Sequence, residues 1–496
     1  MCGVIGIASA GEVVGEIYDG LATLQHRGQD AAGIMIFDGN QFHTKRGDGL
    51  VRDVITAEDI PELRGKIGIG HVRYPTAGSY SCEEAQPFFV NSPLGLGLVH
   101  NGNLTNTEKL RADLIREGRY LNTTSDSEIL LNVFSRELRK QNMQRFAVSK
   151  IFAAAKKTVQ RVSGSYATVI LVAGFGILAI RDPHGLRPLS VGKRKCKKQN
   201  EFAVASENPA LTALGFEFIG DVQPGEAVWL SASGKIFRKQ LVPKNWSPCI
   251  FEYVYLARPD ATIDDISVYR ARLRAGEYLA KEIKKAGIKI DVVVPVPDTS
   301  RTSALTVASE LGVNYREGLI KNRYIGRTFI MPTQAKRQKS IRHKLIPLPL
   351  ELRNKNVLLV DDSIVRGNTS RQIVEMVRGA GAKKVYFASA SPPLRSPCVY
   401  GVDMPSKKEF IANTRNIPQI AKKLKADGVF YLSLPDLVKS CEFNKNKVSQ
   451  FCTACFNGRY PTKEVNTKYL SKIEKQRNLS RKEEGNRNSK QQMTLL

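Results

Sequence analysis

Residues 357–370 read Val357-Leu358-Leu359-Val360-Asp361-Asp362-Ser363-Ile364-Val365-Arg366-Gly367-Asn368-Thr369-Ser370. The apolar run at the start is continuous, which is typical of a strand buried on both faces in a parallel sheet. Two carboxylates follow it, and a loop containing Gly367 leads into a helix. The start of a helix offers free N–H groups and the positive end of the helix dipole, and both attract phosphate. The segment therefore predicts a phosphate-binding strand end in an α/β domain.

The surrounding sequence repeats the alternation of strand and helix. Short apolar runs predict strands at 291–296, 384–388 and 429–432, and amphipathic patterns between the predicted strands indicate helices at 268–286 and 370–378. This alternation predicts a doubly wound α/β domain, preceded by a linker at 245–248.

The first 240 residues follow a different pattern. Short apolar runs such as 33–37, 94–99 and 167–172 are broken by Gly, Asn and Asp, and a helix is expected at 128–140. This pattern predicts a layered, largely β domain with a few helices.

Bulk composition favours a globular protein of two or more domains. The chain has 496 residues, of which 42% are hydrophobic and 25% charged. It contains no apolar run near the roughly 20 residues that a membrane helix needs, and no leader is expected before the first strand. We therefore expect a cytoplasmic protein that has no membrane partner.

The net charge of +28 raises the question of nucleic-acid binding. The basic residues are spread along the chain, with a concentration after about residue 463 in a polar segment that predicts a frayed or disordered tail. A phosphate-rich small substrate would be attracted to a basic protein as well. We therefore expect no nucleic-acid partner.

Cys2 directly follows Met1. Removal of Met1 would place a free α-amine, which titrates at about pH 8, beside the thiol. That amine can act as the base that takes the thiol proton, so Cys2 is a candidate nucleophile.

A second predicted strand end, Val294-Pro295-Val296-Pro297-Asp298-Thr299-Ser300, also carries hydroxyl groups after a buried run. Between the two strand ends, residues 321–329 combine cationic, aromatic and glycine residues, which is typical of a mobile lid over a charged leaving group. The adjacent carboxylates at 361 and 362 suit ribose hydroxyls or a hydrated Mg²⁺.

The pattern at 357–370 is similar to the 5-phosphoribosyl 1-diphosphate (PRPP) signature of type I phosphoribosyltransferases. The resemblance implies that PRPP is held by Asp361, Asp362, Ser363, Arg366, Gly367, Asn368, Thr369 and Ser370, together with Arg323 and Tyr324 of the lid. It also implies one Mg²⁺ per subunit at Thr299, Asp361 and Asp362.

The N-terminal half resembles the glutamine amidotransferases that have an N-terminal nucleophile. The matching segments begin with Cys2-Gly3-Val4-Ile5-Gly6, His26-Arg27-Gly28-Gln29-Asp30-Ala31-Ala32-Gly33 and His71-Val72-Arg73-Tyr74-Pro75-Thr76, and continue with His100-Asn101-Gly102-Asn103-Leu104 and Ser125-Asp126-Ser127-Glu128. The resemblance implies a catalytic role for Cys2, with Asn101 and Gly102 donating to an oxyanion. Glutamine would be bound by Arg73, Thr76 and Asp126.

Together the two halves resemble the amidophosphoribosyltransferase family over the chain to about residue 465. The resemblance implies an α+β N-terminal-nucleophile glutaminase domain with an αββα sandwich at 2–240. A type I phosphoribosyltransferase α/β domain follows at 241–465, and a basic polar tail at 466–496. The implied reaction releases ammonia from glutamine at Cys2 and transfers it through the protein to PRPP, giving 5-phosphoribosylamine, the first committed intermediate of purine synthesis. The alternatives are a glutaminase that serves another ammonia acceptor and a PRPP-sensing, nucleic-acid-binding regulator.

Eight cysteines occur in the chain, and the absence of a leader argues against disulfides. The spacing of Cys452 and Cys455 allows two thiolates on one metal or cluster, so an iron–sulfur cluster, zinc and a redox pair all remain open. Cys249 and Cys398 each follow Ser-Pro. Resemblance to the cluster-bearing branch of the family implies one [4Fe–4S] centre per subunit on these four residues. Cys441 could replace one ligand, although its setting lacks the family match.

The family also implies purine nucleotide inhibitors and a homotetramer. Two features depart from the branch. No propeptide is expected before Cys2, so maturation needs only the removal of Met1. In addition, residues 342–347 lack an Asn that commonly follows the Leu, which leaves the details of nucleotide inhibition open.

Overall fold

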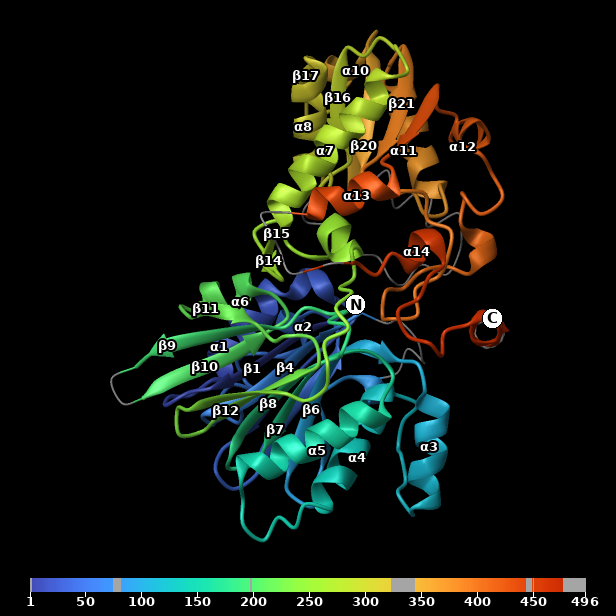
Figure 1. The fold of residues 1–496 in the computed structure, drawn as a ribbon. Coiled ribbons are helices and arrows are strands. Elements are labelled where there is room, and N and C mark those ends of the chain that lie inside the picture. The colour runs from blue at the N-terminus through green and yellow to red at the C-terminus, as the bar shows by residue number, and fades with distance from the viewer. Residues whose placement is uncertain are drawn as a thin grey trace, which may run out of the picture.

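Two layered bodies, joined end to end, make up the fold (Figure 1). The computed structural model describes residues 2–74, 82–196, 199–322, 344–442, 448 and 450–475. The N-terminal body comprises two stacked sheets with helices outside them, and the second body contains a single parallel sheet between helices. The chain therefore has the two-domain architecture that its sequence patterns predict.

The N-terminal body contains two antiparallel sheets, in which the order of the strands differs from their order in the sequence. The first has the order β11-β9-β10-β1-β4-β2-β3 and the second has the order β13-β12-β8-β7-β6-β5. The strands of the first are β1 (Gly3–Ala8), β2 (Ala31–Phe37), β3 (Phe42–Asp48), β4 (Ile67–Arg73), β9 (Ser190–Lys195), β10 (Asn200–Ala205) and β11 (Glu217–Asp221). Those of the second are β5 (Phe88–Val90), β6 (Leu96–Leu104), β7 (Gly164–Val172), β8 (Gly176–Arg181), β12 (Glu226–Ser231) and β13 (Ile236–Gln240).

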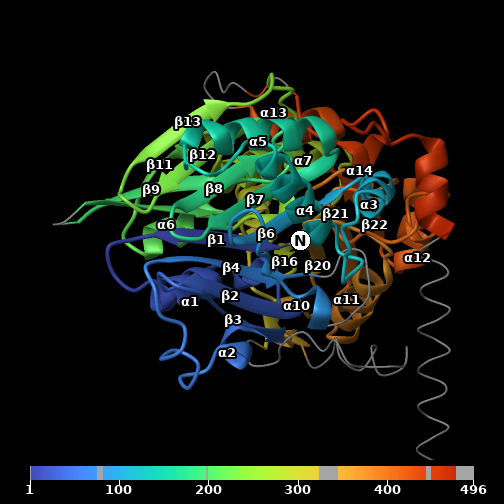
Figure 2. The same cartoon turned by 90° about the horizontal axis from the view of Figure 1, so that it is seen from below.

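Helices cover the outer face of each sheet, which gives four layers (Figure 2). The first sheet packs against α1 (Val14–Thr23), α2 (Val51–Val54) and α6 (Asn208–Ala213), and the second against α3 (Thr107–Arg116), α4 (Asp126–Arg139) and α5 (Val148–Arg161). Between the sheets lies an apolar core that includes Val4, Met35, Val99 and Val169. The αββα sandwich expected from the sequence is confirmed.

The second body is built on a parallel sheet of order β17-β16-β20-β21-β22. Its strands are β16 (Val292–Pro295), β17 (Asn314–Tyr315), β20 (Asn356–Asp361), β21 (Lys384–Ser389) and β22 (Gly428–Tyr431). Helices α7 (Val268–Lys284) and α8 (Arg301–Leu311) contribute to the apolar core on one face, and α11 (Asn368–Gly379) and α12 (Ile417–Leu424) to the core on the other. The continuous apolar runs of the sequence are therefore the buried strands of a parallel sheet.

Smaller elements complete the second body. They are the hairpins β14 (Thr262–Ile263) with β15 (Ile266–Ser267) and β18 (Leu319–Lys321) with β19 (Leu345–Pro347), and the helices α10 (Pro349–Leu352), α13 (Leu434–Cys441) and α14 (Ala454–Asn457). Residues 467–475 are also helical. Tyr469, Leu470 and Ile473 of this last helix pack against the core of the second body, so the predicted tail begins as a docked helix.

A buried cluster of charges joins the two bodies at the β14–β15 hairpin. Arg181 donates to both oxygens of Asp264, at 2.7 and 2.9 Å, and the Asp264 backbone N–H donates to Asp221 at 2.7 Å. Burial, followed by the neighbouring Asp264 carboxylate, raises the pKa of Asp221 to about 7. A carboxyl group whose pKa is raised by folding contributes stability at low pH, and this contribution is lost as pH rises through the folded-state pKa.

We therefore expect Asp221→Asn to raise the melting temperature by several degrees at pH 8, because each unit of pKa shift corresponds to about 1.4 kcal/mol. The gain should shrink as pH falls from about 7 towards 3.8, where the native carboxyl is already protonated in the folded state. Thermal unfolding across this range measures the effect. Asp265→Asn, an exposed neighbour in the same hairpin turn, is the control and should show no such trend. Equal pH dependence in Asp221→Asn and the wild type would contradict the prediction.

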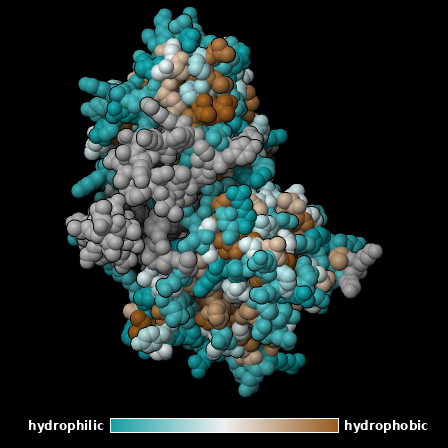
Figure 3. Space-filling model, turned by 180° about the vertical axis from the view of Figure 1, so that it is seen from behind, coloured by the Kyte–Doolittle hydropathy of each residue, from teal (hydrophilic) through white to brown (hydrophobic). Residues whose placement is uncertain are grey.

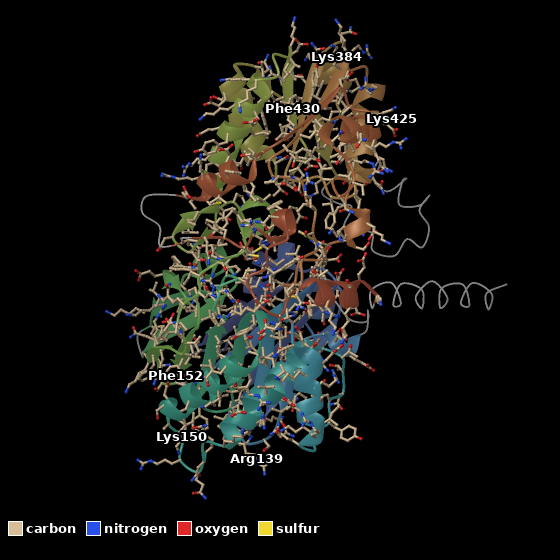
Figure 4. All side chains as sticks on the ribbon, turned by 45° about the vertical axis from the view of Figure 1, so that its right-hand side comes forward. Arg139, Lys150, Phe152, Lys384, Lys425 and Phe430 are labelled. Atoms are coloured by element: carbon tan, nitrogen blue, oxygen red, sulfur yellow. The ribbon has the colours of Figure 1, made fainter. Side chains whose placement is uncertain are left out.

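Hydrophilic side chains cover most of the face drawn in Figure 3, with smaller hydrophobic groups between them. Basic side chains project from both ends of the molecule, such as Arg139 and Lys150 on the first body and Lys384 and Lys425 on the second (Figure 4). Within the described part of the chain, no helix combines the length and apolarity needed to cross a membrane.

Candidate active sites

Cys2 directly precedes β1, which lies between β10 and β4 in the first sheet, and the residue is 8% exposed. Its backbone nitrogen donates to Asn101 Oδ1 at 3.3 Å, and its Sγ lies 3.9 Å from the carbonyl oxygen of Tyr74. This nitrogen belongs to the peptide bond with Met1, and it stands in for the α-amine that removal of Met1 would create. The structure thus places the future α-amine of Cys2 beside Asn101.

Asn101 and Gly102 lie near the end of β6, next to Cys2. Asn101 is 1% exposed, and its Nδ2 has no hydrogen-bond partner among the described residues. A buried donor without a partner costs about 1–3 kcal/mol, so an acceptor from a ligand would be favourable here. Gly102 has φ +153, and an added Cβ would lie 2.1 Å from the Ser165 carbonyl oxygen, so no larger residue fits.

Arg73 and Asp126 supply opposite charges, Arg73 at the end of β4 and Asp126 at the start of α4, where it contacts the end of β6. Arg73 ends β4, and its Nη2 donates to Glu84 Oε2 at 2.7 Å, where a substrate carboxylate would have to compete. Asp126 accepts from the Leu104 N–H at 2.9 Å. Burial alone would raise the pKa of Asp126, but the nearby His100 and the hydrogen bonds lower it. Asp126 is therefore suited to binding an ammonium group. Thr76 lies outside the described residues.

The predicted phosphate loop connects β20 to α11. Gly367 precedes the helix with φ +79, and an added Cβ there would lie 2.4 Å from Ile411 Cδ1. Asn368, Thr369 and Ser370 form the first turn of α11, in which no acidic residue occurs. The free N–H groups of this turn therefore face no competing negative charge from their own helix, as a phosphate site requires.

Asp361 and Asp362 lie at the mouth of this loop. Burial, and then the adjacent Asp362 charge, raises the pKa of Asp361 well above its usual value. Burial also raises the pKa of Asp362 to about 6, although Ser363, Arg272 and a hydrogen bond with Thr299 oppose the rise. Thr299 reaches Asp362 because β16 pairs in parallel with β20, so both strands end at the same edge. A divalent cation bound here would offset the crowded negative charge.

The remaining predicted contacts are only partly described. Arg366 Nε lies 3.2 Å from Glu409 Oε1 in an ion pair, and its side chain is 48% exposed. Lys321 Nζ contacts Asp298 Oδ2 at 2.5 Å at the described edge of the predicted lid. Arg323 and Tyr324 lie outside the described residues.

Four buried cysteines, Cys249, Cys398, Cys452 and Cys455, gather where the two bodies meet. Cys249 and Cys452 form an isolated parallel bridge, and the Cys455 carbonyl accepts from the N–H groups of Arg395 and Ser396 at 2.9 and 3.0 Å. All four are between 7% and 9% exposed. The structure therefore brings together residues that are more than 200 positions apart in the sequence.

The thiols of this group affect one another electrostatically. Burial raises the pKa of Cys249 to about 11 and holds the pKa values of Cys452 and Cys455 well above the usual value of a thiol, and the neighbouring thiols add to the rise. Cys441 is buried apart from them, beside Arg274 and Glu442. No group of three or more Cys, His, Asp or Glu within the described ranges is placed to hold a metal ion. Each thiolate of a [4Fe–4S] cluster binds a different iron, so such ligands need not converge on one point.

Each half of the chain matches a known protein family. Residues 76–213 match the glutamine amidotransferase domain family, and residues 264–393 match the phosphoribosyl transferase domain family. The amidophosphoribosyltransferase of Pseudomonas aeruginosa is 52% identical over 483 residues, and that of Escherichia coli is 51% identical over 484 residues. In both comparisons, 96% of this chain and 96% of the relative are covered.

The chain belongs to the amidophosphoribosyltransferase family. It is accordingly an enzyme of the first step of purine biosynthesis. A solved structure of the glutamine PRPP amidotransferase from B. subtilis, in complex with ADP and GMP, has a TM-score of 0.83 and 37% sequence identity to this chain. The comparison covers 94% of this chain and 98% of the B. subtilis chain, so the two proteins share the fold of both domains.

Sequence reasoning missed a chain of buried charges that connects the two domains of this amidophosphoribosyltransferase. Arg27 pairs with Glu207 and, at 2.8 Å, with Glu252, which in turn accepts from Arg187 Nη1 at 3.0 Å. Arg187 also donates from Nε to the Tyr400 carbonyl at 3.0 Å. These residues are far apart in sequence, so no local pattern predicts their pairing.

Proposed function

We propose that Cys2, after loss of Met1, is the nucleophile that releases ammonia from glutamine. The α-amine takes the thiol proton as Sγ attacks the carboxamide carbon, and the proton passes to the departing ammonia. Asn101 Nδ2 and the Gly102 N–H stabilise the oxyanion, and water then cleaves the thioester to give glutamate. Supporting this are the buried, unpartnered Asn101 amide and its position beside the Cys2 nitrogen. Arg73, Thr76 and Asp126 bind the substrate's α-carboxylate and α-ammonium groups.

In the second site, ammonia attacks the anomeric carbon of PRPP and diphosphate leaves, giving 5-phosphoribosylamine. The 5-phosphate is held by the residues at 363–370 and the start of α11. The ribose hydroxyls bind Asp361 and Asp362, Arg323 neutralises charge on the diphosphate, and Tyr324 contacts PRPP from the same lid. The raised pKa values at Asp361 and Asp362 indicate uncompensated charge, so these carboxylates and Thr299 suit one Mg²⁺ per subunit. When bound, the ion would neutralise charge on the leaving diphosphate.

The test is to supply purified enzyme with PRPP, Mg²⁺ and either glutamine or ammonia. Both nitrogen sources should give 5-phosphoribosylamine, and mass spectrometry should find an N-terminus that starts at Cys2. Retention of Met1 in a fully active glutamine-dependent enzyme would refute the proposed role of the α-amine.

We also propose domain limits at 2–240 and 241–465, with a basic C-terminal segment at 466–496. The end of β13 at Gln240 and the two matched family regions support the boundary.

The B. subtilis relative solved with ADP and GMP supports inhibition of this enzyme by purine nucleotides. We also propose that the protein forms a homotetramer and that it is cytoplasmic.

The four buried cysteines support assignment to the cluster-bearing branch, with one [4Fe–4S] centre per subunit. Their thiols raise one another's pKa values, and binding of iron as thiolates would relieve this cost. The nearby cation is the guanidinium of Arg187, which is paired with Glu252 and faces Cys249 and Cys398. A cluster at this position would tie 249, 398 and 452–455 together.

We expect protein purified without oxygen to be brown, with about four iron and four sulfide per subunit. Cys452→Ser should lose most of the iron and lower the melting temperature. Cys441→Ser is the matched control, because Cys441 is also buried but lies apart from the four, and it should retain the iron. A colourless protein that contains zinc would contradict the assignment.

A further inference from the structure

Gly401 of the C-terminal domain lies against the backbone of the glutamine site. An added Cβ at Gly401 would lie 2.8 Å from the Gly102 carbonyl oxygen and 2.9 Å from the Gly102 carbonyl carbon. Gly401 also has φ +93, a conformation that side chains disfavour. The two backbones therefore meet at a distance that only glycine permits, at the residue whose N–H faces the reaction in the proposed mechanism.

Two hydrogen bonds beside this contact connect the same segments. Asn103 Nδ2 donates to the Val399 carbonyl at 3.0 Å, and Ser165 Oγ donates to the Tyr400 carbonyl at 2.8 Å. Ser165 Oγ also accepts from the Asn103 N–H at 3.1 Å. The segment 399–401 therefore contacts β6 at Gly102 and Asn103, and it contacts β7 at Ser165.

The segment 399–401 is itself held from the other side. The Tyr400 carbonyl accepts from Arg187, whose guanidinium is fully buried and paired with Glu252. The Tyr400 hydroxyl lies 2.8 Å from Thr462 Oγ1, and its backbone N–H donates to Cys398 Sγ at 3.3 Å. With Tyr400 1% exposed, the segment has little freedom to shift without moving several buried groups.

We propose that residues 399–401 of the C-terminal domain are a positioning element for the oxyanion site, with Gly401 as the residue that sets the place of Gly102. Oxyanion donors act only when they are held within roughly 0.5 Å of the productive geometry, and neighbouring residues provide that support. The inference rests on the proposed oxyanion role of Asn101 and Gly102. It adds that glutamine hydrolysis depends on a segment from the other domain that contacts no substrate.

Gly401→Ala in the full-length enzyme tests the inference. The new methyl group must push Gly102 away, so kcat for glutamine hydrolysis should fall about 10- to 100-fold, approaching the loss of one oxyanion donor. The KM for glutamine should change far less, because Arg73 and Asp126 are untouched. Ammonia-dependent synthesis should stay near the wild-type rate, since the second site is not displaced.

Gly458→Ala is the matched control. Gly458 also has a positive φ, +73, and lies near the cysteines, but an added Cβ would meet only Ser396 Oγ, at 3.3 Å. Its substitution should lower the melting temperature through the positive φ alone, by less than Gly401→Ala does, while leaving the glutamine kcat intact. If Gly401→Ala does not fold, Ser165→Ala removes the bond to Tyr400 without adding volume, and it should lower the same kcat more mildly.

A parallel fall of both activities in Gly401→Ala, or an unchanged glutamine kcat in the variant that folds, overturns the inference. Asn101→Ala separates it from the proposed function. If Asn101→Ala keeps full glutamine turnover, the oxyanion assignment itself is wrong. If Asn101→Ala is inactive with glutamine while Gly401→Ala is fully active, only the inference fails.

Discussion

Cys2→Ala should abolish glutamine-dependent synthesis of 5-phosphoribosylamine while synthesis from ammonia continues close to the wild-type rate. Alanine at position 2 leaves the α-amine and the strand β1 in place, so the variant removes only the nucleophilic sulfur. Loss of a nucleophile that forms a covalent intermediate costs at least about 1,000-fold in rate. Ammonia added to the solution bypasses that step and reaches the second site directly.

The measurement compares the two nitrogen sources in the same preparation. Cys196→Ala is the control, because Cys196 is a partly buried cysteine at the end of β9 with no proposed role. It should retain both activities. If Cys2→Ala still forms 5-phosphoribosylamine from glutamine, another residue is the nucleophile, and Asn101 and Gly102 must be reinterpreted with it.

Asp361→Asn and Asp362→Asn should abolish synthesis from both glutamine and ammonia. Each substitution removes a charged oxygen from the proposed Mg²⁺ and ribose contacts, and we expect a loss on the order of 100- to 1,000-fold in kcat/KM for PRPP. Hydrolysis of glutamine to glutamate should persist, because Cys2 lies in the other domain. The pattern is thus the reverse of that for Cys2→Ala.

Stability should move in the opposite direction to activity in these two variants. Folding raises the pKa values of both carboxyl groups, so their ionised forms destabilise the metal-free protein at pH 8, and the neutral amide removes this cost. The melting temperature without Mg²⁺ should therefore rise, and the extra stabilisation that Mg²⁺ gives the wild type should be reduced.

Asp291→Asn is the matched control for the pair. Asp291 accepts from the Asn356 N–H at 2.8 Å at the opposite end of the same sheet, far along β16 and β20 from the loop. It should keep both activities and the response to Mg²⁺. Unchanged PRPP kinetics in Asp361→Asn and Asp362→Asn would refute the proposed metal and ribose contacts.

The architecture could be predicted from the sequence because its determinants are local. The apolar run at 357–360 is buried on both faces and becomes β20, and Gly367 marks the turn into α11. Parallel pairing of β16 with β20 then brings Thr299 to Asp362. The strand and the turn follow from the periodicity and chemistry of neighbouring residues, whereas the role of Thr299 is implied only by the family resemblance.

The contacts between distant segments could not be predicted in the same way. The pairing of Arg27 with Glu252 and the contact of Gly401 with Gly102 depend on how whole layers stack. Spacing linked Cys452 to Cys455 but said nothing of Cys249 or Cys398, which only family resemblance associated with them. No periodic signal in one segment specifies a partner that lies hundreds of residues away.

The buried arginines of the first domain have a consequence for protein synthesis. A ribosome completes the N-terminal half first, so Arg181 and Arg187 emerge before Asp264, Glu252 and Tyr400, which they bind in the finished protein. Until Glu252 arrives, burying the Arg187 guanidinium leaves it without the carboxylate that it binds in the finished protein, at a cost of several kcal/mol. Arg181 is less affected, because Asp221 and Asp182 of the first domain lie near it. We therefore expect the Arg187 side chain to be buried only after Glu252 has left the ribosome, so that the first domain completes its packing when synthesis of the second has begun.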